Sequence, residues 1–217
     1  MNAGWTSKIS RTGLLGLLLT IAGTLVAADD TFEPNYANHM LTPYQGSGIA
    51  PKLVAFRHHF PLKVVVLEDG VFFNERYFER VKEACLAWTN ATKNVRQGGV
   101  TLTCIAAEDP TGADVVFKFG TTQESFGFEG FTSEFGTWAL IRLSARDTTN
   151  QPVSEARLRR VAMHEFGHAL GIWGHSPNPK DIMSLDDRTT EVSTADVNTL
   201  LIAYANEPAT ATTISAP

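Results

Sequence analysis

The stretch that decides the fold of this chain spans residues 164–175 and reads HEFGHALGIWGH. It holds two histidines four residues apart, His164 and His168, with Glu165 between them. On an α-helix, residues i and i+4 lie on one face, so both imidazoles can reach one Zn²⁺ at roughly 2.0–2.1 Å. The pattern therefore predicts a helix that carries two zinc ligands.

The sequence after this helix offers a third ligand. Gly171 can adopt the positive φ that often ends a helix, and the chain reversal can bring His175 back towards the metal. Three protein ligands leave one position open for water, which is typical of a catalytic zinc. Glu165 would then act as general base, because a carboxylate beside the metal can take a proton from water whose pKa the cation lowers to about 7.

At these residues the chain resembles the metzincin metalloproteases, and HEFGHALG at 164–171 is most similar to their matrixin branch. The family pattern is H-E-x-x-H-x-x-G-x-x-H followed by a methionine turn, the Met-turn. Here Gly174 stands at the position of the third histidine and His175 follows it, which we interpret as a one-residue insertion. Gly174 is a second permissive backbone position that can absorb the extra residue. Met183, eight residues after His175, suits the Met-turn, which forms an apolar floor beneath the zinc ligands.

Two other residues compete with His175 for the third ligand position. Asp181 would give an aspzincin arrangement, and Glu191 on a downstream helix would give a gluzincin arrangement. The flanking sequence favours His175, because Ser176 follows it as a serine follows the third histidine of matrixins.

The N-terminus predicts export. Lys8 and Arg11 precede the apolar run 13–28, which ends in small residues and is typical of a secretory signal peptide cleaved near Ala28. The run has about sixteen residues, short of the ~20 that span a bilayer as a helix, so we expect no stable membrane span after cleavage. The mature protein would begin near Asp29 and be secreted or otherwise extracytoplasmic, in the periplasm or cell envelope.

The segment after the signal peptide is rich in proline and glycine and shows little periodicity, which is typical of an extended arm or a pro-segment. Matrixin zymogens are kept latent by a cysteine thiolate that binds the zinc, and this segment contains no cysteine. Asp29 or Asp30 could serve instead, although a solvated arm is the simpler interpretation. We therefore expect a signal peptide at 1–28, an N-terminal arm or pro-segment at 29–52, a catalytic domain at 53–206 and a flexible tail at 207–217.

The cysteine content limits the possible disulfides, and the charge limits the possible partners. Cys85 and Cys104 are the only cysteines, and in an exported chain they either form a disulfide or remain buried free thiols. The formal net charge is −5 and the lysines and arginines form no basic cluster, which argues against nucleic acid as a partner.

Hydrophobic periodicity predicts the other elements. We expect strands at 62–67, 100–106, 113–119 and 138–144, an amphipathic helix at 75–92, the zinc helix from a Ser154 cap to Leu170, and a last helix from Ser193 or Thr194 to Tyr204. The glycine-rich passage through Gly127, Gly130 and Gly136 is interpreted as a loop. This order matches the metzincin domain. The resemblance implies an α/β (α+β) zincin fold, with a twisted mixed β-sheet, an active-site helix and a C-terminal helix.

The resemblance also implies a zinc-dependent metalloendopeptidase, exported according to its N-terminal sequence, with His164, His168 and His175 as Zn²⁺ ligands and Glu165 as general base. Its partners would be protein or peptide substrates that bind along a sheet edge by strand addition, and we expect a monomer. One alternative is a zinc amide hydrolase that acts on non-protein substrates such as cell-wall peptides. Another is an inactive secreted zinc-binding module. Calcium is possible, but the sequence identifies no calcium ligands.

Overall fold

The computed structural model describes residues 32–41, 52–53, 60–68, 70–95, 99–186 and 188–206. The predicted signal peptide, Asp29, Asp30 and the tail at 207–217 lie outside these described residues. Within the described part of the chain, no helix combines the length and the apolar character needed to cross a membrane.

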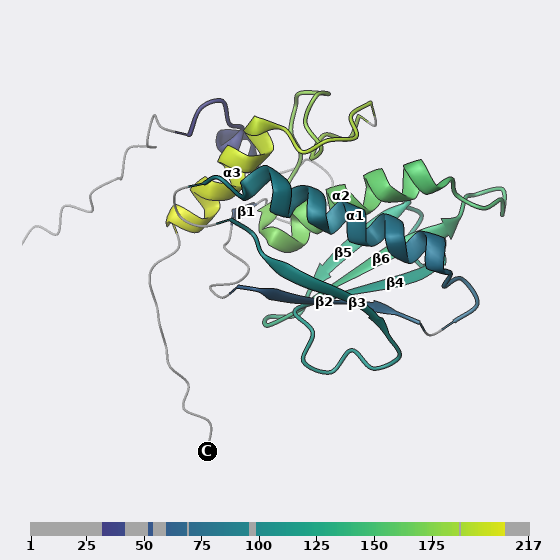
Figure 1. Cartoon of the computed structure of the whole chain (residues 1–217). Helices are drawn as coiled ribbons and strands as arrows, with labels where there is room; N and C mark the ends of the chain where they lie inside the picture. The colour runs from purple at the N-terminus through teal and green to yellow at the C-terminus, as the bar shows by residue number, and fades with distance from the viewer. Residues whose placement is uncertain are drawn as a thin grey trace, which may run out of the picture.

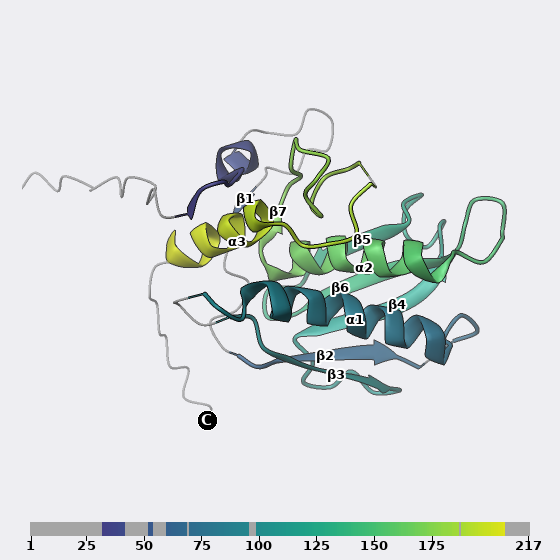
Figure 2. The same cartoon turned by 45° about the horizontal axis from the view of Figure 1, so that its top comes forward.

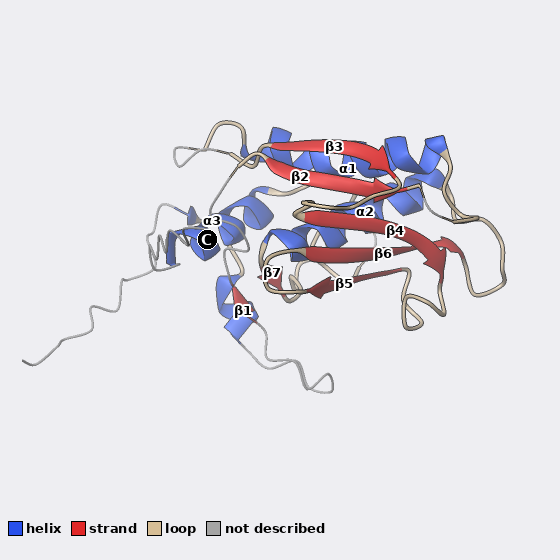
Figure 3. Ribbon diagram, turned by 90° about the horizontal axis from the view of Figure 1, so that it is seen from below, coloured by secondary structure: helices blue, strands red, loops and turns tan. Residues whose placement is uncertain are grey.

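A five-stranded sheet forms the base of the molecule, with the strand order β3-β2-β4-β6-β5. Neighbouring strands run parallel except β5, which pairs antiparallel with β6 at one edge (Figure 3). The buried β-branched run of β2 lies between β3 and β4, as expected for an interior parallel strand. The strands are β2 (Leu62–Leu67), β3 (Leu102–Ala107), β4 (Val115–Thr121), β5 (Gly130–Glu134) and β6 (Ala139–Arg146).

Two long helices, α1 (Glu75–Thr92) and α2 (Glu155–Leu170), lie side by side across one face of the sheet (Figures 1 and 2). Asn74 caps α1 by accepting a hydrogen bond from the Tyr77 N–H, and Ser154 caps α2 in the same way with Arg157. The third helix, α3 (Thr194–Asn206), contacts α1 beyond the end of the sheet. The main core fills the space between helices and sheet, and its largest fully buried side chains include Trp88, Phe117, Phe166, Ile141 and Leu158.

The structure confirms the predicted fold class and most of the predicted elements. The helices at 75–92 and from Ser154 to Leu170 have the expected bounds, and the predicted strands are displaced by two residues at most. One prediction is wrong: β5 occupies part of the glycine-rich passage that we interpreted as a loop. Its sequence, GFTSE, lacks the apolar alternation of a core strand, and β5 is held by pairing with β6 and by contacts with α2.

The N-terminal segment packs against the rest of the domain at two points. A short 3-10 helix, η2 (Ala37–Leu41), follows Tyr36, whose side chain is buried. Further on, β1 (Lys52–Leu53) pairs antiparallel with β7 (Ile172–Trp173), the two residues that follow Gly171. The described parts of the predicted arm are therefore in contact with β7, which directly follows α2, and with the C-terminal part of the domain at 194–206.

Cys85 on α1 and Cys104 on β3 are free thiols in the structure. They contact each other across the interface between helix and sheet, and burial raises the pKa of the Cys85 thiol. Of the two alternatives left open by the sequence, the structure has the free thiols.

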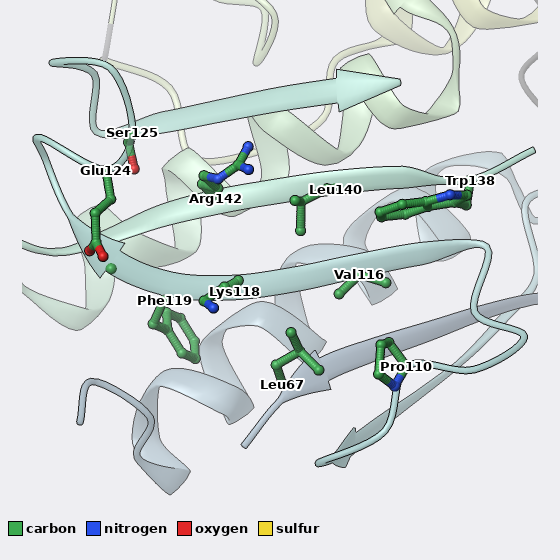
Figure 4. Close-up of a pocket in the computed structure, with 11 residues that line it drawn as sticks. Leu67, Pro110, Val116, Lys118, Phe119, Glu124, Ser125, Trp138, Leu140 and Arg142 are labelled. Atoms are coloured by element: carbon green, nitrogen blue, oxygen red, sulfur yellow. The ribbon is translucent and has the colours of Figure 1, made fainter. Parts of the chain in front are cut away.

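A shallow cavity of about 480 Å³ lies on the face of the sheet away from the helices (Figure 4). Leu67, Val116 and Leu140 form its apolar floor, and Lys118 and Arg142 lie towards one end. Its lining includes none of the three histidines of the 164–175 stretch, so this cavity is not the candidate functional site.

Candidate metal centre

The structure brings His164, His168 and His175 together. Each offers one ring nitrogen, and these nitrogens all lie within 4.8 Å of one another. The first two histidines occupy successive turns of α2, and the third lies in the loop after β7. His164 is buried and the other two are half-buried, so the group is open on one side and can hold a metal ion.

Backbone carbonyls fix the orientation of the two helical imidazoles. Nδ1 of His164 lies 2.8 Å from the carbonyl oxygen of Ile182, and Nδ1 of His168 lies 2.6 Å from that of Ile172. A carbonyl oxygen only accepts, so each Nδ1 carries the proton and donates it. Nε2 of each neutral ring is left with its lone pair for a metal, which is the usual support for a ligating histidine.

All three imidazoles are neutral near pH 7. Burial lowers the pKa of His164 well below its ordinary value and that of His168 to about 4. Burial and the neighbouring His168 together lower the pKa of His175 to about 3. Metal binding requires neutral imidazole, so the donor set fits Zn²⁺.

His175 is followed by a hydrogen-bonded serine that fixes the loop. The Ser176 N–H donates to the carbonyl of Met183 at 3.0 Å, and the Ser176 hydroxyl donates to Oδ2 of Asp181 at 2.5 Å. The other carboxylate oxygen of Asp181 accepts from the Ser193 hydroxyl at 2.7 Å. Asp181 is therefore buried in a hydrogen-bond network behind the histidines and is not a member of the metal-binding group.

The second competing ligand, Glu191, also lies apart from this group. Its side chain is 76% exposed, and it pairs with Arg159 at 3.8 Å. Of the three sequence-derived candidates for a third ligand, the structure places His175 beside the two helical histidines.

The residue inserted before His175 lies in the short segment between Gly171 and His175. Gly171 has the expected positive φ, 125°, and ends α2. Gly174 lies at a bend of the chain directly before His175 and has no positive φ; that it absorbs the extra residue stays a prediction. The same segment contains the extended pair β7, which is held by pairing with β1.

Glu165 is buried beneath the edge strand β5. The hydroxyl of Thr132 on β5 donates to Oε2 of Glu165 at 2.6 Å. Burial raises the pKa of Glu165 to about 7, while the Thr132 hydrogen bond and the charge of Arg160 act in the opposite direction. A carboxyl group with a pKa near 7 can both accept and release a proton at neutral pH.

Met183 lies directly under the metal-binding turn of α2 and is fully buried. A Cβ atom at Gly167 would collide with Sδ of Met183 and would approach Cζ2 of Trp88 to 2.8 Å. Glycine at 167, between the two helical histidines, is therefore needed for the helix to rest on this floor. Sequence analysis did not single out Gly167 or Thr132, whose contacts come from residues distant in the sequence.

Comparison with known proteins agrees with this geometry. The matrixin family model matches residues 74–205, which is more than half of the chain and extends from α1 to α3. Comparison with curated proteins gives no match.

Proposed function

Because this chain belongs to the matrixin family, whose members are zinc metalloproteases, we propose that it is an exported endopeptidase with a catalytic Zn²⁺ held by His164, His168 and His175. One observation carries the proposal. Three neutral imidazoles converge beside Glu165, a buried carboxyl group that is not itself part of the metal-binding group. A structural zinc has four protein ligands and needs no such carboxylate.

Zn²⁺ in such a site supplies Lewis acidity, which polarises the scissile carbonyl and lowers the pKa of water to about 7. Glu165 takes the proton from the attacking water and later transfers it to the leaving amine. Thr132 occupies Oε2 of Glu165, so we assign the proton transfer to Oε1. The hydroxyl of Thr132 thereby keeps the base in one orientation through both proton transfers.

The position of β5 at the edge of the sheet is an argument for a peptide substrate. Its pairing with β6 leaves its other edge without a strand partner among the described residues. An extended peptide can add to such an edge through main-chain hydrogen bonds, which impose little side-chain preference. Since Thr132 belongs to β5, the same strand would position both the peptide and the general base.

The proposal of export rests on the sequence of residues 1–28, with cleavage near Ala28. Mass spectrometry of the mature protein should find an N-terminus near Asp29. An intact Met1 in a membrane fraction would instead indicate a retained anchor.

The activity is tested with purified mature protein, whose zinc content is measured by elemental analysis while casein hydrolysis is followed. We expect about one zinc per chain and hydrolysis that a chelator abolishes and added Zn²⁺ restores. Glu165→Gln protein, purified in parallel, controls for contaminating proteases. Chelator-resistant hydrolysis, or hydrolysis of equal rate in the control, would refute the proposal.

A further inference from the structure

Tyr36, in the N-terminal segment, reaches a buried carboxylate of the last helix. Its hydroxyl donates to Oδ1 of Asp196 at 2.6 Å, and its backbone N–H donates to the Thr199 hydroxyl at 3.0 Å. Tyr36 is only 4% exposed and Asp196 is fully buried. This contact joins residues 160 positions apart in the sequence.

Asp196 is also the residue that holds the Met-turn. Its Oδ2 accepts from the N–H groups of Ile182 and Ser193, each at 2.8 Å, and its Oδ1 lies 3.3 Å from the Met183 N–H. The carbonyl of Ile182 in turn accepts from Nδ1 of His164. A continuous series of hydrogen bonds therefore connects the Tyr36 hydroxyl with the first helical histidine.

The same N-terminal segment meets the support of the second helical histidine. In the pairing of β1 with β7, Leu53 is the partner of Ile172. The carbonyl oxygen of Ile172 is the group that accepts from Nδ1 of His168. The segment thus reaches one of these two carbonyls through Asp196 and pairs with the residue that carries the other.

The hydroxyl of Tyr36 contributes to this arrangement in a way that a phenyl ring could not. Asp196 is a buried carboxylate, and its other bonds come from the backbone of the turn and the helix that it joins. Without the hydroxyl, Oδ1 of Asp196 would keep only its 3.3 Å hydrogen bond from the Met183 N–H, and this oxygen is buried. The turn that carries Ile182 would then be held less tightly.

We propose that Tyr36 is a positioning residue for the metal site, and that the described parts of the N-terminal segment, residues 32–41 and 52–53, are a permanent part of the catalytic domain instead of a removable pro-segment. The inference rests on the zinc site of the proposed function. The N-terminal segment holds in place the two carbonyls that orient His164 and His168.

The test compares Tyr36→Phe with Tyr77→Phe in the otherwise unchanged mature protein. Tyr77 is a matched control because it is also buried and its hydroxyl donates to the carbonyl of Val153 at 2.7 Å, which is not part of the metal site. Zinc affinity is measured by competition with a chromophoric chelator. Loss of an outer partner of a metal ligand typically weakens metal binding 10–100-fold, so we expect about tenfold for Tyr36→Phe and no change for Tyr77→Phe.

A second measurement uses the metal-free protein and needs no activity. Amide hydrogen exchange at Ile182 and Met183 should become faster in Tyr36→Phe and stay as in wild type in Tyr77→Phe. In an Asp196→Asn background, Tyr36→Phe should have little further effect on zinc affinity, because both substitutions break the same series of hydrogen bonds.

The outcomes separate the two proposals. If wild-type protein binds zinc and Tyr36→Phe binds it equally well, with unchanged exchange at Ile182 and Met183, Tyr36 is only a packing residue. The inference is also overturned if the full effect of Tyr36→Phe persists in the Asp196→Asn background. If the wild-type protein itself binds no zinc, the proposed function fails, whereas the exchange measurement still decides the coupling between Tyr36 and the Met-turn.

Discussion

The hydroxyl of Thr132, on the edge strand β5, donates a 2.6 Å hydrogen bond to Oε2 of Glu165, on the helix that carries two of the three histidines. The same hydroxyl also lies 3.0 Å from the backbone carbonyl of Glu165. The strand at which we propose that a peptide binds is thus joined directly to the proposed base. Substitutions at residue 132 should therefore change the rate of the chemical step of the reaction.

Thr132→Val keeps the shape of the side chain and removes the hydroxyl. A hydrogen bond to a charged group contributes about 1.5–3 kcal/mol, so we expect kcat to fall by about tenfold or more with little change in KM. Because the Thr132 bond lowers the pKa of Glu165, the acidic limb of the kcat/KM profile should also move to higher pH. Thr132→Ser should restore both properties, and an unchanged pH profile in Thr132→Val would contradict the assigned role.

Glu165→Gln separates catalysis from metal binding. The residue is outside the metal-binding group, so the variant should retain about one zinc per chain. Turnover should fall by ~10²–10⁴, the usual contribution of general acid–base catalysis. Zinc content and peptide hydrolysis measured on the same preparation check both expectations. A rate near that of the wild type would rule out Glu165 as the base.

The same substitution should change the stability of the metal-free protein in a pH-dependent way. The folded-state pKa of Glu165 is about 7 against an ordinary value of 4.5, so at pH 8 the wild type buries a charge that it does not bury at pH 4. The folded state therefore loses stability as pH rises from 4.5 through 7. Glu165→Gln removes this loss and should be more stable than wild type by about 3 kcal/mol at pH 8. Urea unfolding at pH 8 and pH 4 measures the difference, which should vanish at pH 4.

Three alanine substitutions, compared by their zinc affinity, distinguish the candidates for the third ligand. Asp181→Ala removes the acceptor behind Ser176 and should weaken zinc binding about 10–100-fold, as for other outer partners of a ligand. His175→Ala should weaken it more than that and abolish proteolysis. Glu191→Ala, at an exposed position, should leave the affinity unchanged. Loss of zinc in either acidic variant with retention in His175→Ala would replace the metzincin assignment by an aspzincin or gluzincin arrangement.

The sequence predicted those parts of the molecule whose signals are local. The bounds of α2 follow from the Ser154 cap, the spacing of its apolar residues and the positive φ of Gly171. The two helical histidines of the candidate site follow from the i, i+4 relation, because the helix itself brings them together. Helix α3 was predicted to start at Ser193 or Thr194, and it starts at Thr194.

The parts that could not be predicted depend on contacts between distant residues. β5 has no core-strand pattern and becomes a strand only because β6 lies beside it. Thr132 is 33 residues from Glu165, and Tyr36 is 160 from Asp196. The loop before His175 also depends on a distant contact, the pairing of β7 with β1.

The central claim is a zinc ion held by three imidazoles with one position open. Zinc K-edge X-ray absorption on the purified protein measures this coordination directly. The predicted spectrum has three imidazole nitrogens and one water oxygen, all at roughly 2.0–2.1 Å. Four protein ligands would make the site structural. Two imidazoles with a carboxylate would exclude His175, and either result would contradict the claim.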